Sequence, residues 1–473
     1  MDRALSGQPG PDDLEPLTTD EVDRPRPTVP EQAREPSVGP QRRPPYGRNP
    51  LLAAHGVRAR AEIVEAAREL FARYGYQATT VESIGEATNR SGAAVYQYFS
   101  GKFEIFEIFL REVGDELGRV TEQFPLLTDD DTGRRALRDW IVQFMEMIEH
   151  HAGTFLGWSQ IQFSDPELAV LGQENFQRYQ TTILDRLVRA RVHPPALSVV
   201  PVGIISVIQW SALLNDRSGR PVGRQALAAA LATMLHAFLF APAAEAVGPE
   251  PDKPLADYHL PTIPLGDELG LRRPVTPRGV GTVQRILLAA AERFRVNGYR
   301  GTSLNDVAAR AGVSHGSVYT YWADREALFG TLARDATAAV TAQRCRPPVG
   351  EPPGEVIDRW VDGWMTVIDR HGSVLYVWQH EVGGPGLEQL SAQRDQALDA
   401  VVADLMGLCP EPPADPVALG VALRAVITDV PFVLSAQLAI LPRSDAADFV
   451  AQLLRAGLGA SRGDAPPSMK PIP

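Results

Sequence analysis

Residues 286–325 decide the fold, and they read ILLAAAERFRVNGYRGTSLNDVAARAGVSHGSVYTYWADR. Residues 63–102 read IVEAARELFARYGYQATTVESIGEATNRSGAAVYQYFSGK and align with them without a gap, at an offset of 223 residues. A self-match at one fixed offset indicates a duplicated structural unit. Two copies are too few for a solenoid, and each copy is long enough to be a small domain.

Each copy has the pattern of three short helices. The second helix begins at a hydroxyl that can cap it, Thr80 or Ser303, and Ser303 forms a capping-box pattern with Asp306. The turn that follows holds Gly312 or Asn89, both of which accept a positive φ. Before them, apolar residues of copy one recur at helical spacing and end at a glycine. These residues are Ile63, Ala66, Ala67, Leu70, Phe71 and Tyr74.

The third helix is expected over residues 92–99 and at the same place in copy two. One side of it is apolar, and the other carries residues that could contact DNA. Val95 and Phe99, like Val318 and Trp322, are spaced to pack inward, which leaves the neighbouring tyrosines at the flanks. Small residues at the helix start allow close approach to base edges in the major groove of DNA. Core packing is the simpler explanation for two tyrosines on one helix. It is weakened because both copies keep Tyr-x-Tyr-aromatic followed by a cation.

These residues resemble the TetR family of bacterial transcriptional regulators. The motif is F-x-x-x-G-Y, then T-[TS], then A-G-V-S-x-G-[ST]-V-Y-x-Y-[FW]-x-x-[KR]. Copy two matches it closely, whereas copy one has Gly85 where the family usually has Ala and Asn89-Arg90 where it usually has Gly-Val. The resemblance implies an all-α fold, with a three-helix DNA reader joined to a bundle that binds a small molecule and dimerises. It also implies a homodimer on palindromic DNA, often a repressor that its ligand releases.

The duplication continues beyond the motif, at an offset of 220 residues. Trp140, Met145, Ile148, His151 and Trp158 fall on Trp360, Met365, Ile368, His371 and Trp378. Alternating strand patterns are scarce, so the chain is expected to be all-α with two tandem units. We expect a disordered acidic, then Arg-rich arm over 1–50, a helix-turn-helix domain over 51–104, a helical regulatory domain over 105–243, a Pro-rich linker over 244–279, a second helix-turn-helix domain over 280–327, a second regulatory domain over 328–461 and a disordered tail over 462–473.

The net charge of −12 argues at first against a nucleic-acid partner, but its distribution favours one. Residues 42–60 hold five arginines and no acid, and residues 272–300 hold seven arginines and one acid. The alternative is a solvated arginine cluster in a linker. No apolar run reaches ~18 residues, so no membrane span is expected. The two cysteines, Cys345 and Cys409, fit a reducing compartment, and the expected location is cytoplasmic, in a bacterium and associated with the nucleoid.

DNA contacts are expected from the second and third helices and the cation after them. Gln97 can pair bidentately with adenine, and His315, Ser317 and Thr320 can also reach base edges. Tyrosine hydroxyls and the cations Lys102 and Arg325 suit phosphates. The full set of expected DNA-binding residues is Thr80, Ser91, Gly92, Ala93, Tyr96, Gln97, Tyr98, Lys102, Ser303, Ser314, His315, Gly316, Ser317, Tyr319, Thr320, Tyr321 and Arg325.

The helical bodies offer candidates for a pocket that binds a hydrophobic effector. The alternative is that their aromatic residues simply form a core. The candidate pocket residues are Trp140, Phe144, Trp158, Gln160, Trp360, Trp364, Trp378, His380 and Glu381. His151 and His371 are expected to close helix ends rather than bind a metal, and we expect no catalytic residues, metal or cofactor.

One chain already carries two readers and two bodies. We therefore expect an intramolecular pseudo-dimer or a homodimer, whose halves pack through residues 225–241 and 445–457 and read an asymmetric operator. An enzyme is disfavoured, because the chain has no G-x-S-x-G, no H-E-x-x-H, no phosphate loop and no G-x-G-x-x-G after a strand. The remaining alternative is a ligand-binding or protein-interaction module with a degenerate first reader, which Arg90 favours. The operator, the effector, the regulated genes and the direction of regulation are not encoded in these patterns.

Overall fold

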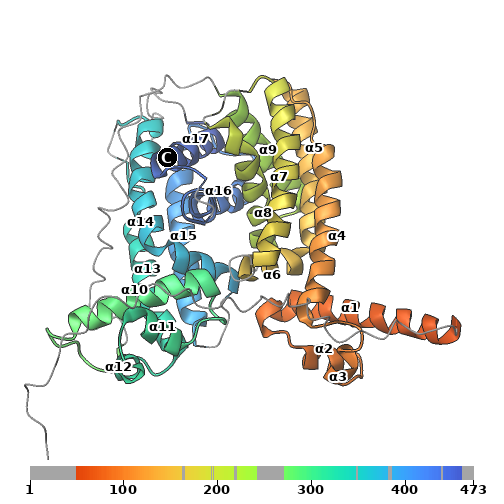
Figure 1. Cartoon of the computed structure of the whole chain (residues 1–473). Coiled ribbons are helices and arrows are strands. Elements are labelled where there is room, and N and C mark those ends of the chain that lie inside the picture. The colour runs from red at the N-terminus through yellow and green to blue at the C-terminus, as the bar shows by residue number, and fades with distance from the viewer. Residues whose placement is uncertain are drawn as a thin grey trace, which may run out of the picture. The chain divides into compact units, whose positions relative to one another are not determined.

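All regular structure in the described part of the chain is helical, as the sequence pattern predicts, and no strand occurs there. The computed structural model describes residues 50–161, 166–192, 194, 196–217, 221–241, 271–347, 350–381, 386–437 and 440–460 (Figure 1). The expected arm and tail, and residues 242–270 of the linker region, lie outside the described residues.

The first half of the chain contains three helices at the place of copy one and a helical body after them. They are α1 (Pro50–Ala78), α2 (Val81–Ala87), α3 (Gly92–Val95), α4 (Lys102–Glu122), α5 (Asp131–His150), α6 (Ala152–Ile161), α7 (Pro166–Arg189), η1 (Leu197–Val199), α8 (Val200–Arg217) and α9 (Arg224–Phe240). The second half repeats this order. Its helices are α10 (Val280–Asn297), α11 (Leu304–Ala311), α12 (His315–Tyr321), α13 (Arg325–Ala342), α14 (Pro353–Glu381), α15 (Glu388–Met406), α16 (Pro416–Thr428), the π-helical η4 (Phe432–Gln437) and α17 (Arg443–Leu458).

Local sequence signals explain where several body helices begin. The Asp130 carboxylate accepts hydrogen bonds from the backbone N–H groups of Thr132 and Gly133 at the start of α5. Asp415 does the same at the start of α16, where Pro416 occupies the first helical position. Such side chains satisfy N–H groups that have no partner within the helix, and proline is tolerated there because its missing N–H is not needed.

The two bodies differ at their matched histidines. His151 is the C-cap of α5, with α6 starting at the next residue, and its Nε2 lies 2.7 Å from Glu116 Oε2 of α4. His371 instead lies within α14, which continues through it as one helix of 29 residues. The prediction that both histidines close helix ends is therefore wrong for His371. Burial lowers the pKa of His371 to about 3, so it is neutral at ordinary pH.

The buried apolar residues form two clusters, one small and one much larger. One cluster belongs to the first reader and the start of α4, and it includes Ile63, Phe71, Val95 and Phe99. The other runs through the second reader and both helical bodies. Tyr74, predicted on the buried face of the first helix, is 48% exposed. The backbone turns at Gly75, the kink in α1, and the next residue, Tyr76, is buried in its place (8% exposed).

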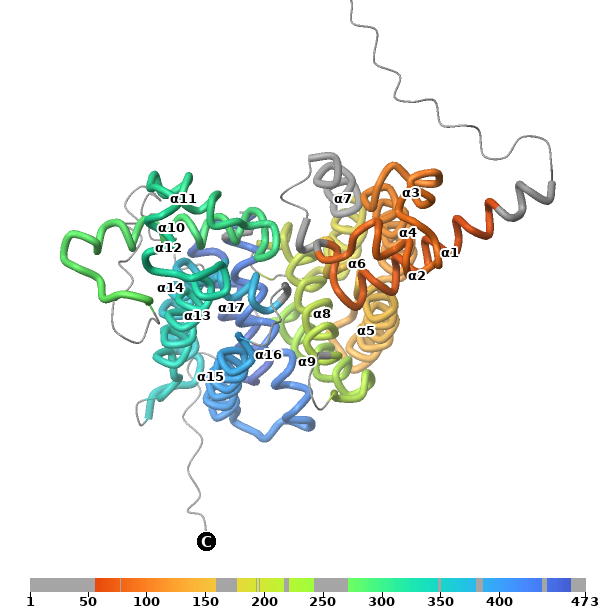
Figure 2. The backbone as a smooth tube through the Cα atoms, turned by 90° about the horizontal axis from the view of Figure 1, so that it is seen from below, coloured from red at the N-terminus to blue at the C-terminus, as the bar shows by residue number. Residues whose placement is uncertain are grey.

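The two halves pack against each other through their apolar later helices. α9 lies against α17 and α16, and α8 lies against α16, so four helices share one core (Figure 2). The rings of Phe238 in α9 and Phe449 in α17 are 5.0 Å apart, and those of Trp210 in α8 and Tyr376 in α14 are 6.0 Å apart. Because these four side chains are buried, the contact between the halves is an apolar one.

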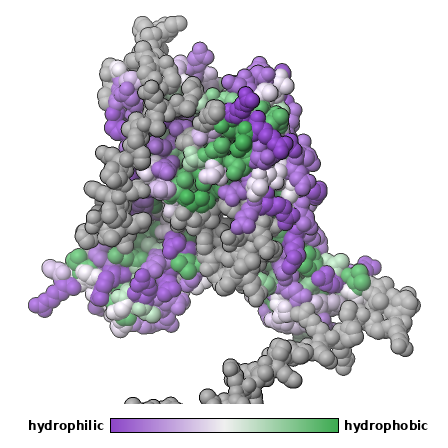
Figure 3. All heavy atoms as spheres, turned by 45° about the horizontal axis from the view of Figure 1, so that its top comes forward, coloured by the Kyte–Doolittle hydropathy of each residue, from purple (hydrophilic) through white to green (hydrophobic). Residues whose placement is uncertain are grey.

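Two helical segments are long and apolar enough to cross a membrane, which corrects the expectation that the chain has none. They are Leu197–Asp216 and Pro416–Ser435, and 72% and 78% of their apolar windows are buried inside the protein. On the face drawn in Figure 3, hydrophilic side chains dominate the described surface; the largest apolar area lies in its upper part, and smaller apolar areas lie lower down. The burial of both segments is that of core helices in a folded domain.

The contact between the halves can be tested with Phe449→Ala. We expect this change to lower the free energy of unfolding by about 3–5 kcal/mol, because it leaves a cavity against α9. Urea unfolding followed by circular dichroism measures the loss. Val417→Ala, at a position of α16 that is 62% exposed, is the control and should stay within about 0.5 kcal/mol. A loss below about 1 kcal/mol for Phe449→Ala would contradict close packing of the halves.

Candidate DNA-binding interface

The second helix of each reader is fixed by a reciprocal cap. Thr80 Oγ1 accepts the N–H of Ser83, and Ser83 Oγ accepts the N–H of Thr80, at 3.1 and 3.0 Å. Ser303 and Asp306 make the same pair of bonds at 3.1 and 3.0 Å. The bonds from Ser303 lower the pKa of the Asp306 carboxyl below its ordinary value, so the cap holds an ionised group at neutral pH. The capping-box prediction for Ser303 and Asp306 is confirmed, and Thr80 has an equivalent cap.

The turn between the second and third helices has the same backbone path in both readers. Gly312 and Asn89 both have positive φ, 64° and 54°. The Val313 N–H donates to the Ala308 carbonyl at 3.0 Å, and the Arg90 N–H donates to the Gly85 carbonyl at 2.8 Å. A side chain at Gly85 would put its Cβ 2.8 Å from the Arg90 carbonyl oxygen. The tighter turn of the first reader therefore requires glycine where the second reader has alanine.

Arg90 replaces an apolar contact of the second reader with an ionic one. Val313 packs against the main apolar core. Arg90 instead donates to the Glu62 carboxylate of α1 at 2.6 Å and to the Thr88 carbonyl at 2.9 Å. The same position of the turn thus makes an ionic contact with α1 in the first reader and an apolar contact with the core in the second.

The third helices bury one face and expose the other. Val95, Phe99, Val318 and Trp322 are all at most 1% exposed, as predicted. Tyr96 and Tyr319, at equivalent positions, are 54% and 40% exposed. The exposed tyrosines lie beside the expected base-reading positions, so core packing does not account for them.

The third helix of the first reader is shorter than predicted. It was expected over residues 92–99, but α3 ends at Val95 and a turn follows through Tyr98. In this turn the Gln97 N–H donates to the Ala94 carbonyl at 3.2 Å. The bond spans three residues, whereas that of an α-helix spans four, so the backbone is more tightly wound here. In the second reader, α12 continues to Tyr321. Gln97 is therefore presented from a turn rather than from a helix.

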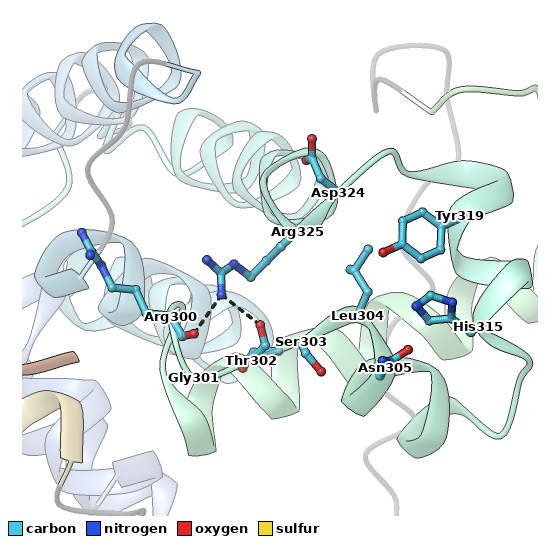
Figure 4. A pocket seen from close by; sticks show the side chains of 10 residues that line it. All are labelled: Arg300, Gly301, Thr302, Ser303, Leu304, Asn305, His315, Tyr319, Asp324 and Arg325. Carbon is cyan, nitrogen blue, oxygen red and sulfur yellow. Dashed lines mark hydrogen bonds between the residues drawn. The ribbon is translucent and has the colours of Figure 1, made fainter. Parts of the chain in front are cut away.

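A surface hollow of about 320 Å³ lies in the second reader where its elements meet. Figure 4 shows the side chains around it, with Tyr319 and His315 facing the start of α11 and with Arg300 and Arg325 at the other end. Its lining residues are Arg300, Gly301, Thr302, Ser303, Leu304, Asn305, His315, Tyr319, Asp324 and Arg325. Backbone N–H groups at a helix start, a tyrosine hydroxyl and two guanidinium groups are together suited to a phosphate group.

The comparisons with known proteins agree with this geometry. The sequence model described as "Bacterial regulatory proteins, tetR family" matches residues 63–108 and 286–332, one match for each reader. Both readers of the chain belong to the tetR family. Because both matches contain the three reader helices, the chain is a tandem regulator whose two units each carry a helix-turn-helix domain. This is a family of DNA-binding transcriptional regulators rather than of enzymes.

Several curated relatives are regulators of this kind. The HTH-type transcriptional activator FasR of Mycolicibacterium smegmatis is 27% identical over 165 residues, which is 33% of this chain and 74% of FasR. The HTH-type transcriptional repressor AcnR of Corynebacterium efficiens is 41% identical over 56 residues, 12% of this chain and 30% of AcnR. The match to AcnR thus spans less than a third of that protein's length. A tetR-family transcriptional regulator from Streptomyces coelicolor aligns with 39% of this chain and 80% of its own, at 24% identity and a TM-score of 0.31.

The two cations expected to bind phosphates, Lys102 and Arg325, are hydrogen-bonded to backbone carbonyls of their own readers. Lys102 Nζ donates to the carbonyl oxygens of Tyr76 and Thr79 at 2.8 and 2.9 Å. Burial lowers the pKa of this ammonium group. Arg325 donates to the carbonyls of Arg300 and Thr302 at 2.8 and 3.1 Å. Both cations tie the helix after the reader to the loop between its first and second helices.

The same tie uses residues that the sequence reasoning missed. Lys102 lies over the Tyr76 ring at 4.4 Å, and Arg325 lies over the Tyr299 ring at 4.5 Å. The buried Thr79 and Thr302 hydroxyls donate to Gly75 and Gly298 in the same loops, both at distances of 2.8–2.9 Å. The signal that could have found these residues is their recurrence, since both copies keep Gly-Tyr and a threonine three residues later.

The remaining predicted contacts of the tetR-family readers are exposed but partly engaged. The Ser91 and Ser314 hydroxyls cap α3 and α12. Ser317 Oγ lies 2.8 Å from Ser314 Oγ, and Thr320 Oγ1 donates to the Gly316 carbonyl at 3.0 Å. A hydroxyl so engaged keeps a lone pair for a hydrogen-bond donor on a base. The exposed positions are Ala93, Gln97, His315, Gly316 and Thr320, and Gly92, Tyr98 and Tyr321 are partly buried.

The aromatic residues considered for an effector pocket are mostly core residues. Trp140, Phe144, Trp360, Trp364 and Trp378 are all at most 7% exposed. The indole N–H groups of the four tryptophans donate within the protein, at 2.6–2.9 Å. A satisfied indole in a packed core stabilises the fold and does not by itself indicate a ligand.

Of the remaining pocket candidates, Trp158 is the one whose side chain the structure describes. Trp158 packs against the small core of the first reader, away from the cluster that holds Trp140. The side chains of Gln160, His380 and Glu381 lie outside the described residues. Within the described part of the chain, no group of three or more possible metal ligands occurs.

The tie between reader and body can be tested at Arg325. We expect Arg325→Ala to lower the free energy of unfolding by roughly 1.5–3 kcal/mol, because two carbonyls lose a charged donor. Arg325→Lys should keep most of the stability, since Lys102 makes the equivalent bonds in the first half. Thermal and urea unfolding measure both variants. Equal stability of Arg325→Ala and the native chain would contradict this role.

Proposed function

We propose that one chain supplies both DNA readers of a tetR-type dimer and binds an asymmetric operator. The observation that carries the proposal is the packing of α9 against α17, which buries Phe238 against Phe449. The resemblance implies that the helical bundles of the family dimerise, and the halves of this chain were expected to pack through residues 225–241 and 445–457. Here the equivalent helices of one chain cover each other, which supports a pseudo-dimer formed within a single chain.

The asymmetry of the operator is supported by the exposed residues of the two third helices. Equivalent positions differ where bases would be read. These pairs are Gly92 and His315, Ala93 and Gly316, Ala94 and Ser317, and Gln97 and Thr320. Readers with different base-contacting side chains prefer different half-sites, and readers of this type bind half-sites about one DNA turn apart, on the order of 34 Å.

Phosphate contacts in this proposal come from the capped helix starts and from tyrosines, of which Tyr96 and Tyr319 are exposed and Tyr98 and Tyr321 partly buried. Tyr96, Tyr98, Tyr319 and Tyr321 contribute hydroxyls, and the hollow beside Tyr319 is the phosphate site of the second reader. Arg325 contributes positive charge to this hollow, and Lys102 contributes positive charge to the first reader, while each is bonded to backbone carbonyls. Thr80, Ser91, Ser303 and Ser314 hold the helix starts that face the DNA.

For regulation, we propose a cytoplasmic, nucleoid-associated repressor that a hydrophobic small molecule releases from DNA. The family habit supports repression, and the name of AcnR is that of a repressor, whereas FasR is named an activator. The effector would bind within a helical body. A reporter gene placed under the chain's own operator tests this. Reporter expression that rises when the chain is present would show activation instead of repression.

The second candidate is a binding module whose first reader no longer reads DNA. Arg90 and the short α3 favour it. The intact cap and turn of the first reader favour the first candidate, because Asn89 and Gly85 reproduce the backbone path of the second reader. Gel shifts on the DNA upstream of the gene, with Tyr96→Ala and Tyr319→Ala separately, distinguish them. If Tyr319→Ala abolishes binding and Tyr96→Ala leaves it unchanged, the first reader is degenerate.

The two classes of DNA contact should respond differently to mutation. We expect Tyr319→Ala to weaken binding to all sequences to a similar extent and to leave the salt slope nearly unchanged, because the lost phosphate contact is an uncharged one. Gln97→Ala should relax specificity at one base pair, at a cost of ~1–3 kcal/mol for the preferred base. Binding titrations at several salt concentrations measure both. If both variants lose only general affinity, the assignment of Gln97 to a base is wrong.

The pseudo-dimer predicts the mass of the complex. One chain should bind one operator, and light scattering of the complex should give the mass of one chain plus the DNA. The chain alone has a mass of 51.4 kDa, so one and two chains are easily separated. Two chains on a long symmetric operator would contradict the pseudo-dimer.

A further inference from the structure

The first reader carries an acidic side chain where its second and third helices meet. Glu82 lies in the first turn of α2 and is exposed. A methyl group added to Gly92, the first residue of α3, would lie 3.4 Å from Glu82 Oε1. The carboxylate is therefore next to the start of the third helix, which is the part of a helix-turn-helix reader that meets base edges.

Glu82 has no side-chain partner among the described residues, unlike Glu62 and Glu104 but like Glu69 and Glu86. Glu62 binds Arg58 and Arg90, and Glu104 accepts from the Ser100 N–H and hydroxyl. No hydrogen bond or ion pair of Glu82 occurs in the part of the chain that the structure describes. Its carboxylate thus faces solvent with all its acceptor sites open.

The corresponding corner of the second reader has different chemistry. Asn305 replaces Glu82, and His315 replaces Gly92, with the His315 ring 4.5 Å from the Tyr319 ring. Both Asn305 and His315 line the hollow of that reader. An amide and an imidazole can each donate a hydrogen bond, whereas an ionised carboxylate can only accept.

We propose that Glu82 determines specificity by accepting a hydrogen bond from the N4 amino group of a cytosine in the half-site of the first reader. In the major groove, guanine shows two acceptors and thymine shows an acceptor and a methyl group, so both are disfavoured beside a carboxylate. Adenine offers an amino group next to an acceptor nitrogen, whereas cytosine offers the amino donor alone. Cytosine is therefore the best match.

The neighbouring side chains support this assignment. Gly92 has no side chain, and Ala93 and Ala94 have no polar side-chain atoms, so the start of α3 itself offers no side-chain hydrogen bond to a base. Glu82 fills that place from α2, while Gln97 follows from the turn after α3. A carboxylate near phosphates repels them, so Glu82 weakens binding wherever it finds no amino donor.

The inference rests on the proposed function, and one experiment separates them. The full-length chain and its Glu82→Gln variant are each used to select sequences from a random double-stranded DNA library, and the affinities of the enriched sequences are then measured. We expect the native chain to enrich two different half-sites, one with an essential cytosine. Glu82→Gln should shift the roughly tenfold preference at that position from cytosine to adenine, with which a glutamine amide pairs bidentately, while the other half-site is unchanged.

Two further variants serve as a matched control and as a transfer of the first reader's residues to the second reader. Glu69→Gln makes the same charge change at an exposed position of α1 and should leave both half-sites unaltered. Asn305→Glu combined with His315→Gly should bring a cytosine preference into the second half-site. If Glu82→Gln tightens binding to all sequences equally, Glu82 is only a repulsive charge and the inference fails while the proposed function stands. If the native chain enriches no sequence, the proposed function fails, and the inference fails with it.

Discussion

The structure depends on the burial of α9 against α17. Both helices are apolar on the sides that meet, and neither half could expose such a surface to water without a large cost in free energy. Because both belong to one chain, the second half is always present at a high effective concentration beside the first. The contact therefore does not depend on the concentration of the protein, as that of an ordinary dimer does.

This covalent link also removes the demand for symmetry. In a homodimer every substitution appears twice, so a residue that suits one half-site must suit the other. Here the two readers have diverged, and the divergence reaches their cores. The first reader has Arg60 over the Phe99 ring at 4.8 Å, where the second reader has the fully buried Val283. With Arg90 in place of Val313, two positions that are apolar in one reader are arginines in the other.

Features that depend on a few neighbouring residues could be predicted from the sequence. The caps at Thr80 and Ser303, the positive φ at Asn89 and Gly312, and the inward packing of Val318 and Trp322 all follow from local chemistry. Each needs only the side chain and the backbone within one turn of it.

Features that depend on distant segments could not be predicted in the same way. A cation after the third helix suits a phosphate by its charge, but only the fold brings Lys102 and Arg325 to carbonyls 23 to 26 residues earlier in the chain. The aromatic residues of the bodies were ambiguous for the same reason, since a spacing does not say whether a ring meets a neighbour or a cavity. Recurrence between the copies was the one long-range signal available.

The interruption at His151 has a mechanical consequence. α5 and α6 meet at this residue, whereas the matching α14 runs unbroken past His371. A helix that is interrupted at one residue transmits less of a displacement along its axis than a continuous helix does. α14 lies against α10 of the second reader, and that reader shares its apolar core with the bodies, while the first reader has a core of its own. In the proposed complex with one asymmetric operator, a movement that begins in the bodies would thus displace the two readers unequally, and one reader would leave its half-site first.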